Sequence, residues 1–218
     1  MKYGQLPTSL GIFEVECQEM MFYQYMPIKL AGSFYIDFDD RLQCFFELIV
    51  KCTNDYATIL GLDAYQDAFV YITAKHMYQT PNNSFNRMGW HSDGFMTDDI
   101  NYIWSNSYPT IFNDSEFNLT LDDSISLIEM DLQAKEEHNI VGIENSLYRL
   151  NQFNIHKVQP IRVGGMRTFV KISFSKDKYD LLGNTKNYLL EYNWEMKERK
   201  EERNIPQSVI LSTNKQKR

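Results

Sequence analysis

The sequence has few cysteines and no long apolar run. Its three cysteines, Cys17, Cys44 and Cys52, cannot all pair, and none forms a Cys-x-x-Cys motif. This scarcity favours a reducing compartment and leaves a zinc finger without ligands. The first residues, MKYGQLPTSLGIFEVE, lack the apolar core of a signal peptide, and no segment reaches the length of a membrane span. We therefore expect a cytoplasmic protein.

The sequence also lacks an excess of positive charge. Its 22 Lys and Arg residues against 29 Asp and Glu residues give a formal net charge of −7. Such a chain has no global basic field that would attract duplex nucleic acid or an anionic membrane. Lys157, Arg162 and Lys171 can still form a local positive mouth. A small molecule or a protein side chain is the expected substrate, ahead of a nucleic acid, and no membrane partner is expected.

What the sequence does contain is apolar and aromatic residues, 43% and 14% of the 218 positions. A chain of this length and composition can bury one good-sized core. There is no internal repeat and no low-complexity linker. The sequence therefore predicts a single domain over 1–218, mainly β with flanking helices (α+β).

Segments typical of strands outnumber those typical of helices. Residues 40–60 have the best helical spacing of apolar residues, with Asp39 or Asp40 available as the N-cap. A final helix with a charged end is expected at 187–204. The segments expected to form strands are 12–28, 32–40, 67–78, 100–113 with the strand stopping at Pro109, 115–120, 124–133, 145–158 and 166–175. This order is typical of a β-sandwich or barrel with helices packed outside.

The stretch RMGWHSDGF, residues 87–95, contains His91 and Asp93 two positions apart. In an extended chain these side chains share one face, so an imidazole and a carboxylate would converge. A metal site needs a third ligand, and the sequence has four histidines. His138 lies in a charged segment and is a poor candidate. His156, at the end of an apolar segment, is a better one.

Two histidines and a carboxylate on one face of an iron ion leave three positions open. That set suits non-haem Fe(II), which binds O2 and a chelating co-substrate. Eleven residues after His156, Arg167 opens the clearest strand of the chain. Alternate residues of this strand face opposite sides. The apolar face toward the helices is formed by Thr168, Val170, Ile172 and Phe174. The face toward the interior is formed by Arg167, Phe169, Lys171 and Ser173. A buried arginine needs an anionic partner.

The pattern of His91, Asp93, His156 and Arg167 resembles the HxD…H…R pattern of the Fe(II)/2-oxoglutarate-dependent dioxygenases, whose core is a double-stranded β-helix, or jelly-roll (cupin-like) fold. The segment IHKVQPIRVGGMRTFVKISFS is especially similar to the C-terminal part of that core. The resemblance divides the chain into N-terminal strands and a helix, a jelly-roll core, and a C-terminal helix and tail, at 1–66, 67–176 and 177–218.

The resemblance implies that His91, Asp93 and His156 ligate Fe(II) and that Arg167 receives the distal carboxylate of 2-oxoglutarate. Arginine suits that role because its planar fork binds carboxylates bidentately and stays charged. The implied cofactors are Fe(II), the co-substrate 2-oxoglutarate and O2. The implied activity is that of an oxygenase, most simply a hydroxylase, which couples decarboxylation of 2-oxoglutarate to oxidation of a substrate.

Alternatives remain for several residues. His76 is the second choice of ligand in place of His91, and Arg162 competes with Arg167. Tyr71 and Tyr102 can donate hydrogen bonds to the co-substrate or serve as core aromatics. Residues near the motif that are candidates for substrate contact are Arg87, Trp90, Phe95 and Arg162.

Three other functions compete with this hypothesis. One is a jelly-roll binding or structural protein without turnover. Another is a cupin-like enzyme that uses a different metal and no 2-oxoglutarate. The third is a nucleobase-modifying dioxygenase, since Trp90, Phe95 and Trp104 could stack a base as well as a proline ring.

Overall fold

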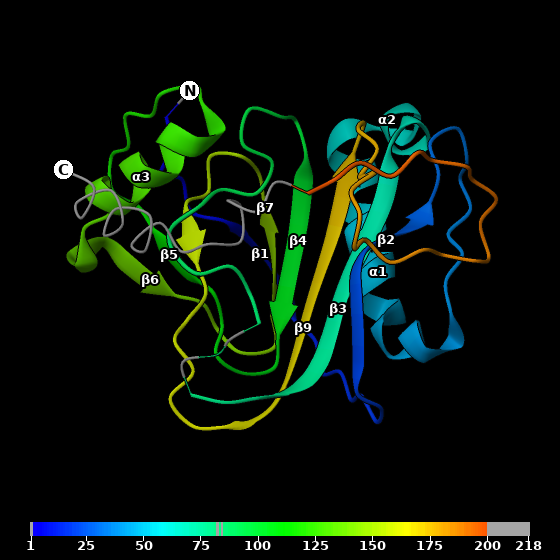
Figure 1. Ribbon diagram of the computed structural model, residues 1–218, viewed down its shortest axis with the longest axis horizontal. Coiled ribbons are helices and arrows are strands. Elements are labelled where there is room, and N and C mark those ends of the chain that lie inside the picture. The colour runs from blue at the N-terminus through cyan, green and yellow to red at the C-terminus, as the bar shows by residue number, and fades with distance from the viewer. Residues whose placement is uncertain (1, 82, 84, 200–218) are drawn as a thin grey trace.

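The computed structural model of the protein describes residues 2–199 except 82 and 84, and antiparallel β-sheets dominate it (Figure 1). A large sheet has the strand order β1-β7-β4-β9-β3-β2, and a small sheet has the order β6-β5-β8. All of these strand pairs are antiparallel. The predicted β-rich fold with few helices is confirmed.

The large sheet contains β1 (Thr8–Ile12), β2 (Met21–Lys29), β3 (Phe69–Gln79), β4 (Ile100–Ser105), β7 (Ser146–Leu150) and β9 (Gly165–Ser175). The small sheet contains β5 (Ile111–Asn113), β6 (Asn139–Val141) and β8 (His156–Lys157). The helical segments are η1 (Asp40–Phe45), α1 (Phe46–Leu60), α2 (Leu62–Asp67), α3 (Asp123–Gln133) and η2 (Glu136–His138).

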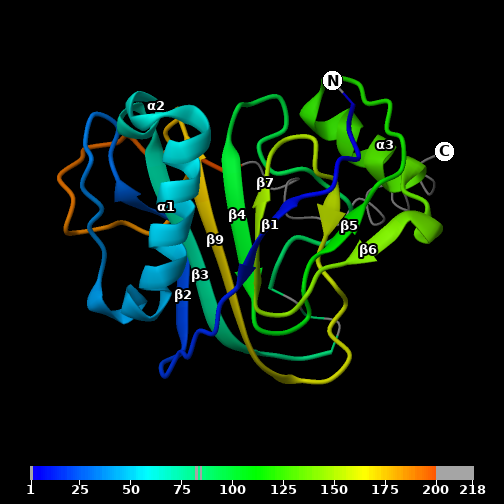
Figure 2. The same cartoon turned by 180° about the vertical axis from the view of Figure 1, so that it is seen from behind.

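Helix α1 covers one face of the large sheet (Figure 2). The predicted helix at 40–60 is confirmed, with a 3-10 first part, η1, that continues into α1. The Asp39 carboxylate caps η1 by accepting a hydrogen bond from the Arg41 N–H. The ring of Tyr56 in α1 stacks on Phe174 of β9, with centroids 4.3 Å apart. This contact helps to fix the helix on the sheet.

Strands β3 and β9 pair along their full lengths, and β9 lies between β3 and β4 in the middle of the sheet. They confirm the strands predicted at 67–78 and 166–175. Alternate residues of β9 face opposite sides, as predicted: Val170, Ile172 and Phe174 lie in the core under α1, whereas Phe169 and Lys171 line a cavity on the other side. The sheet therefore has an apolar helix face and a polar cavity face.

The strand predicted at 124–133 is wrong, because this segment forms α3. The Asp122 carboxylate accepts hydrogen bonds from the backbone N–H groups of Ser124 and Ile125 and so caps the helix. Leu127 and Met130, three positions apart, are both buried. The cap and this spacing favour a helix over the alternation of apolar residues.

The helix predicted at 187–204 is also wrong over 187–199, which contains no helix, and its last residues lie outside the described part of the chain. The Asn187 side chain donates hydrogen bonds to the backbone carbonyls of Pro27 and Asp37. The ring of Trp194 packs edge-on against an aromatic ring of β3. These tertiary contacts determine the conformation despite the helical pattern.

Five other predicted strands differ from the structure. Residues 13–20 separate β1 from β2, and 32–40 form a turn, an exposed loop and the start of η1. The segment 115–120 contributes only an isolated bridge at Phe117. The segments around Pro109 and Phe153 each divide into two strands that belong to different sheets.

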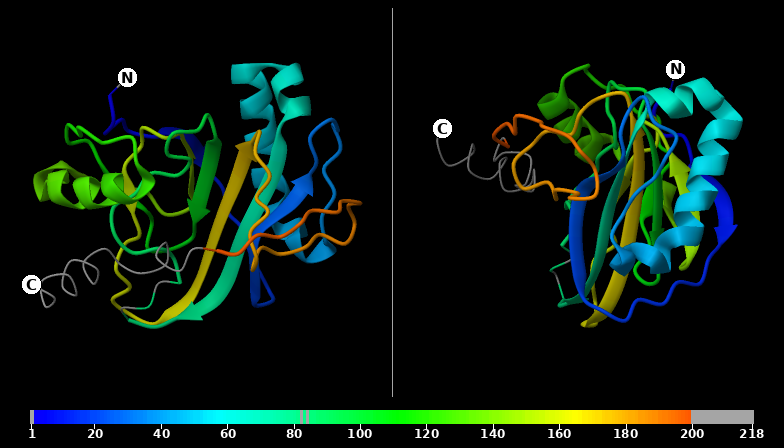
Figure 3. Two further views of the ribbon diagram at one scale, coloured as in Figure 1. Left: turned by 45° about the horizontal axis from the view of Figure 1, so that its top comes forward. Right: turned by 90° about the vertical axis from the view of Figure 1, so that its right-hand side faces the viewer.

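Residues of the two sheets and of the segment after β9 line a common cavity. Figure 3 shows α1 on one side of the large sheet and residues 176–199 on the other. Helix α3 lies beside the small sheet. Within the described part of the chain, no helix is both long and apolar enough to cross a membrane.

Candidate metal centre

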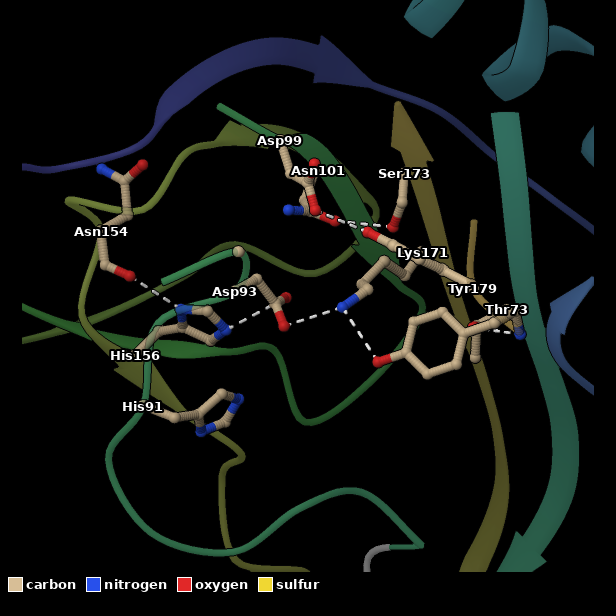
Figure 4. Close-up of polar contacts among 12 residues, drawn as sticks. Thr73, His91, Asp93, Asp99, Asn101, Asn154, His156, Lys171, Ser173 and Tyr179 are labelled. Carbon is tan, nitrogen blue, oxygen red and sulfur yellow. Dashed lines mark hydrogen bonds and ion pairs between the residues drawn. The ribbon is translucent and has the colours of Figure 1, made fainter. Parts of the chain in front are cut away.

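His91, Asp93 and His156 point toward one another at the end of the cavity nearest the small sheet (Figure 4). One ligand atom of each side chain lies within 4.8 Å of those of the other two. Within the described residues, no other group of three His, Cys, Asp or Glu side chains comes as close. His156 belongs to β8, whereas His91 and Asp93 lie in the connection between β3 and β4.

The two histidines are held together by their own backbones. The N–H of each donates to the carbonyl of the other at 2.9 Å, which makes an isolated antiparallel bridge. Residues paired in this way project their side chains from the same face. The ring centroids are accordingly 4.5 Å apart. The bridge therefore unites two residues that are distant in sequence.

Hydrogen bonds define the tautomers of both rings. Nδ1 of His91 lies 2.9 Å from the Gly89 carbonyl oxygen, and Nδ1 of His156 lies 2.9 Å from that of Asn154. A carbonyl only accepts, so each Nδ1 carries a proton and each Nε2 is the ring nitrogen left to face a metal. Burial and the neighbouring His156 lower the pKa of His91 to about 3, so this ring is neutral at neutral pH. His91 thus has the neutral form that metal ligands need, and Nδ1 of His156 is anchored to a carbonyl in the same way.

The Asp93 carboxylate lies between a histidine and a lysine. Its Oδ2 is 3.6 Å from Nε2 of His156, and its Oδ1 is 2.7 Å from Nζ of Lys171. Burial by itself would raise the pKa of Asp93, but Lys171 and His156 hold it well below its usual range. Burial would likewise lower the pKa of Lys171, but Asp93 more than compensates and raises it. The carboxylate and the ammonium group are therefore both charged.

A tight turn after Asp93 directs this carboxylate into the cavity. Gly94 has φ +68°, and a Cβ there would lie 2.8 Å from Oγ1 of Thr97 and 2.9 Å from Cβ of Asp99. Any other residue at this position would clash and would also be strained. The glycine in the sequence motif is therefore needed for the geometry of the site.

Tyr25 approaches Lys171 from a bulge in β2. Its φ of +45° is uncommon for a residue with a side chain, and its N–H donates to Oγ1 of Thr73 at 3.0 Å. The Lys171 ammonium lies 3.4 Å from the Tyr25 hydroxyl oxygen, to which it donates. The bulge thus places a phenol beside the Lys171–Asp93 ion pair.

The cavity has a volume of about 550 Å³ and a polar wall on the large sheet. There Lys75 donates to the Phe85 carbonyl oxygen at 2.6 Å. Burial, with the positive charges of Arg167 and Lys171, lowers the pKa of Lys75 to about 8. The buried Asn101 accepts a hydrogen bond from a serine of β9, but its Nδ2 has no partner among the described residues. This wall therefore offers donors and positive charge.

Arg167, predicted to hold the co-substrate, is 2% exposed and is not among the residues that line the cavity. Its Nε donates to the Ser107 carbonyl oxygen and its Nη2 to that of Tyr108. Its Nη1 is buried without a partner among the described residues. Burial lowers the pKa of Arg167 to about 10. The anionic partner that the sequence predicted for Arg167 is thus not a carboxylate of the described residues, because the two hydrogen bonds of this side chain go to backbone carbonyls.

Two predicted co-substrate contacts, Tyr102 and Tyr71, lie away from the cavity lining. The Tyr102 hydroxyl donates to Asp55 of α1 at 2.9 Å, because this ring lies on the helix face of β4. The Tyr71 hydroxyl donates to the Asp177 carbonyl oxygen, and its ring stacks on Tyr179. Both tyrosines serve as core aromatics in this structure, so the co-substrate role has no support from their positions.

The predicted substrate contacts divide into two groups. Arg87 and Phe95 line the cavity, whereas Trp90 and Arg162 do not. The Trp90 ring is buried with the Lys157 ammonium 4.2 Å from its centroid, and Arg162 is exposed. The expectation that Trp104 could stack a base is wrong, because this ring is buried and its N–H donates to two backbone carbonyls.

The remaining histidines lie outside the cluster. His76 packs on the helix face, where its Nδ1 is 2.8 Å from Oγ1 of Thr168. His138 is exposed and pairs with Asp114 at 2.8 Å. Neither lines the cavity. Their positions agree with the sequence preference for His91 and His156 over these two.

Sequence reasoning missed the contacts of Lys171, Lys75, Asn101 and Tyr25 around the site. The strand alternation did place Lys171 on the interior face, but nothing in the sequence indicated that it pairs with Asp93. Lys75 and Asn101 alternate with apolar residues in their strands, and that pattern was the available signal. The bulge at Tyr25 had no recognisable sequence signal.

No protein-family model and no curated protein matches this sequence. Two solved structures that it resembles are of EvdO2 from Micromonospora carbonacea var. aurantiaca. The first is 13% identical with a TM-score of 0.40, over 62% of this chain and 64% of that chain, which is less than two thirds of its length. The second, complexed with 2-oxoglutarate, is 13% identical with a TM-score of 0.40, over 68% and 76%. Likeness at this level identifies neither the fold nor the activity of this chain.

Proposed function

We propose that this protein is an Fe(II)- and 2-oxoglutarate-dependent oxygenase, most simply a hydroxylase. The observation that carries the proposal is the convergence of His91, Asp93 and His156 beside a cavity, with Nδ1 of both histidines anchored to backbone carbonyls. Two histidines and one carboxylate are the ligands of non-haem Fe(II) oxygenases. The donor set therefore fits the metal.

We also propose that the two sheets are the halves of a jelly roll. Along the chain, β3, β4, β7 and β9 lie in the large sheet, whereas β5, β6 and β8 lie in the small sheet. The His91–His156 bridge adds a further strand position beside β8. Together these make two sets of four, the number of strands in a jelly roll. Strands β1 and β2 extend the large sheet at its edges.

A dicarboxylate co-substrate suits the charge of the cavity wall. Lys75, Arg167 and Lys171 are buried on neighbouring strands, and Asp93 pairs with Lys171, whereas Lys75 and Arg167 donate to carbonyl or amide oxygens. Buried charges without counterions are costly, so this region favours an anion. We propose that one carboxylate of 2-oxoglutarate binds here. Arg167 is the anchor implied by the sequence, whereas Lys171 of the same strand lines the cavity.

The residues of the site have separable roles in the proposed reaction. His91, His156 and Asp93 would hold the metal and leave its other positions open to the cavity. Fe(II) bound there would supply the redox chemistry that couples decarboxylation of 2-oxoglutarate to substrate oxidation. Lys171 holds Oδ1 of Asp93 and leaves Oδ2 on the side of His156. The lysine thereby orients the carboxylate as a ligand through one oxygen.

We propose a small molecule or a protein side chain as the substrate, ahead of a nucleic acid. A cavity of about 550 Å³ has the size of small-molecule sites. Arg87 and Phe95 at its lining remain candidates for substrate contact. Trp104 is unavailable for stacking a nucleobase because it is buried and hydrogen-bonded.

The proposal is tested by anaerobic addition of Fe(II) and 2-oxoglutarate to the purified protein. We expect a visible metal-to-ligand charge-transfer band, and succinate formation once O2 is admitted. The His91→Ala, Asp93→Ala double variant should lose the band, whereas His76→Ala, which alters a histidine on the helix face, should keep it. Absence of the band in the wild type, or its persistence in the double variant, would contradict the proposal.

The anchor of the distal carboxylate is tested by two variants of one strand. Arg167→Ala and Lys171→Met each remove one cation from the same strand. The variant of the true anchor should raise the 2-oxoglutarate concentration needed for half of the band while Fe(II) binding is retained. If neither variant changes this concentration, the carboxylate binds elsewhere.

A second candidate is a binding protein without turnover. The observation in its favour is the Lys171–Asp93 pair at 2.7 Å, which neutralises the carboxylate without a metal. In that case 2-oxoglutarate or another dicarboxylate would bind equally well in the presence of a chelator. Calorimetry with and without Fe(II) separates the two functions, because the oxygenase requires the metal for tight co-substrate binding.

A further inference from the structure

Cys17 and Cys44 lie next to each other on the side of the large sheet opposite the cavity. Their Sγ atoms are 3.3 Å apart, and both side chains pack against the core under α1. Cys17 belongs to the segment 13–20 between β1 and β2, and Cys44 belongs to η1. We propose that this pair is an oxidation site at which the two thiols form a reversible intramolecular disulfide.

The geometry requires only a small movement. A disulfide has an S–S distance of about 2.05 Å, so the sulfur atoms must approach by roughly 1.2 Å. Both residues lie outside the strands of the two sheets, in segments that no sheet hydrogen bonds restrain. The third cysteine, Cys52, is fully buried in α1 and is a natural internal control.

A surface groove gives an oxidant access to one of the two sulfurs. Cys44 lines this groove together with Glu16, Glu19, Asp40 and Arg41. Three carboxylates against one guanidinium make the groove negative, which disfavours anionic reagents. A small neutral oxidant such as hydrogen peroxide therefore fits better than oxidised glutathione, which is an anion at neutral pH.

The contact between the thiols makes them chemically unequal. The hydrogen bond with Cys17 lowers the pKa of Cys44, and the same contact raises the pKa of Cys17. The Cys44 thiolate is thus the better nucleophile. It attacks one oxygen of the peroxide, the O–O bond breaks, and the products are a Cys44 sulfenic acid and hydroxide. The Cys17 sulfur then attacks the Cys44 sulfur, water leaves, and the disulfide forms.

The test uses the full-length protein, reduced and then freed of reductant, with hydrogen peroxide as the probe. Free thiols in the denatured chain should fall from three to one. Peptide mass spectrometry should show residues 17 and 44 joined with the loss of two hydrogen atoms, and dithiothreitol should reverse it. The closed loop should raise the Tm by about 5–10 °C. Oxidised glutathione should react more slowly than peroxide.

Three variants make the outcome decisive. Cys52→Ser should form the same cross-link as the wild type, whereas Cys17→Ser should stop at a trappable sulfenic acid on Cys44. Cys44→Ser should show neither product. The proposal is overturned if three thiols persist after treatment, if Cys52 enters the cross-link, or if the disulfide joins two chains. None of these measurements involves metal or 2-oxoglutarate, so they are independent of the proposed oxygenase function.

Discussion

The two faces of the large sheet differ in chemistry although the same strands supply both. On the helix face, Val170, Ile172 and Phe174 are buried with the apolar residues of α1. On the cavity face, the alternate residues of the same strand include Lys171, which pairs with Asp93. Apolar burial stabilises a fold, whereas a buried ion pair contributes little net stability. Alternate residues of β9 therefore have different roles: those on the helix face stabilise the fold, and those on the cavity face belong to the proposed site.

The largest expected effect follows from truncation on the helix face. Phe174→Ala removes a ring that stacks on Tyr56 and contacts Tyr65 and Tyr102. We expect the free energy of unfolding to fall by about 3–5 kcal/mol, the usual cost of a large cavity in a core. Urea denaturation measures the loss. The folded fraction should still bind Fe(II) as the wild type does, and a loss of under about 1 kcal/mol would contradict the assigned role.

A smaller effect is expected from Lys171→Met on the cavity face. This change leaves the buried Asp93 carboxylate without its ammonium partner, so in chelator the free energy of unfolding should fall by about 3 kcal/mol. A divalent metal would supply the missing positive charge. Mn(II) should therefore stabilise the variant more than it stabilises the wild type. An equal loss with and without metal would argue that no metal reaches Asp93.

The smallest effect concerns pH and distinguishes two buried lysines. Burial, with the neighbouring Arg167 and Lys171, lowers the pKa of Lys75 to about 8, and burial lowers that of Lys29 beside α2 to a similar value. Between this value and the usual pKa of about 10.4, the unfolded chain binds more protons. Each lysine therefore destabilises the fold below about pH 8, and this cost disappears as the pH rises toward 10.4.

The advantage of Lys75→Met over the wild type should accordingly shrink by about 2 kcal/mol between pH 7 and pH 10. Denaturation at several pH values measures this slope, with Lys29→Met as the matched variant. Bound 2-oxoglutarate should flatten the slope for Lys75, because an anion favours its charged form, and leave that of Lys29 unchanged. If both slopes respond alike, the anion does not bind on the cavity face.

The sequence was sufficient for features that depend on local periodicity. The helix at 40–60, the paired strands β3 and β9 and the two faces of β9 all follow from spacing and from one N-cap residue. The same reasoning was wrong at 124–133 and 187–199, where the pattern was ambiguous. In the first case a side-chain cap decided the structure, and in the second, contacts from distant residues did so.

The site was only partly predictable for a related reason. The spacing of His91, Asp93 and His156 indicated a cluster, and the structure brings the three together. The sequence did not predict three contacts that shape the site: the backbone bridge between the two histidines, the bulge that places Tyr25, and the Lys171–Asp93 ion pair. Each of these joins segments far apart in the chain, and local sequence patterns carry no record of such pairings.

The most direct measurement is anaerobic calorimetric titration of Fe(II) into three proteins: the wild type, His156→Ala and His76→Ala. The two altered histidines lie on opposite sides of the large sheet, one in the cluster and one on the helix face beside Thr168. We predict one ion per chain with equal affinity for the wild type and His76→Ala, and at least about 100-fold weaker binding for His156→Ala. Equal affinity of His156→Ala and the wild type would contradict the proposed metal centre.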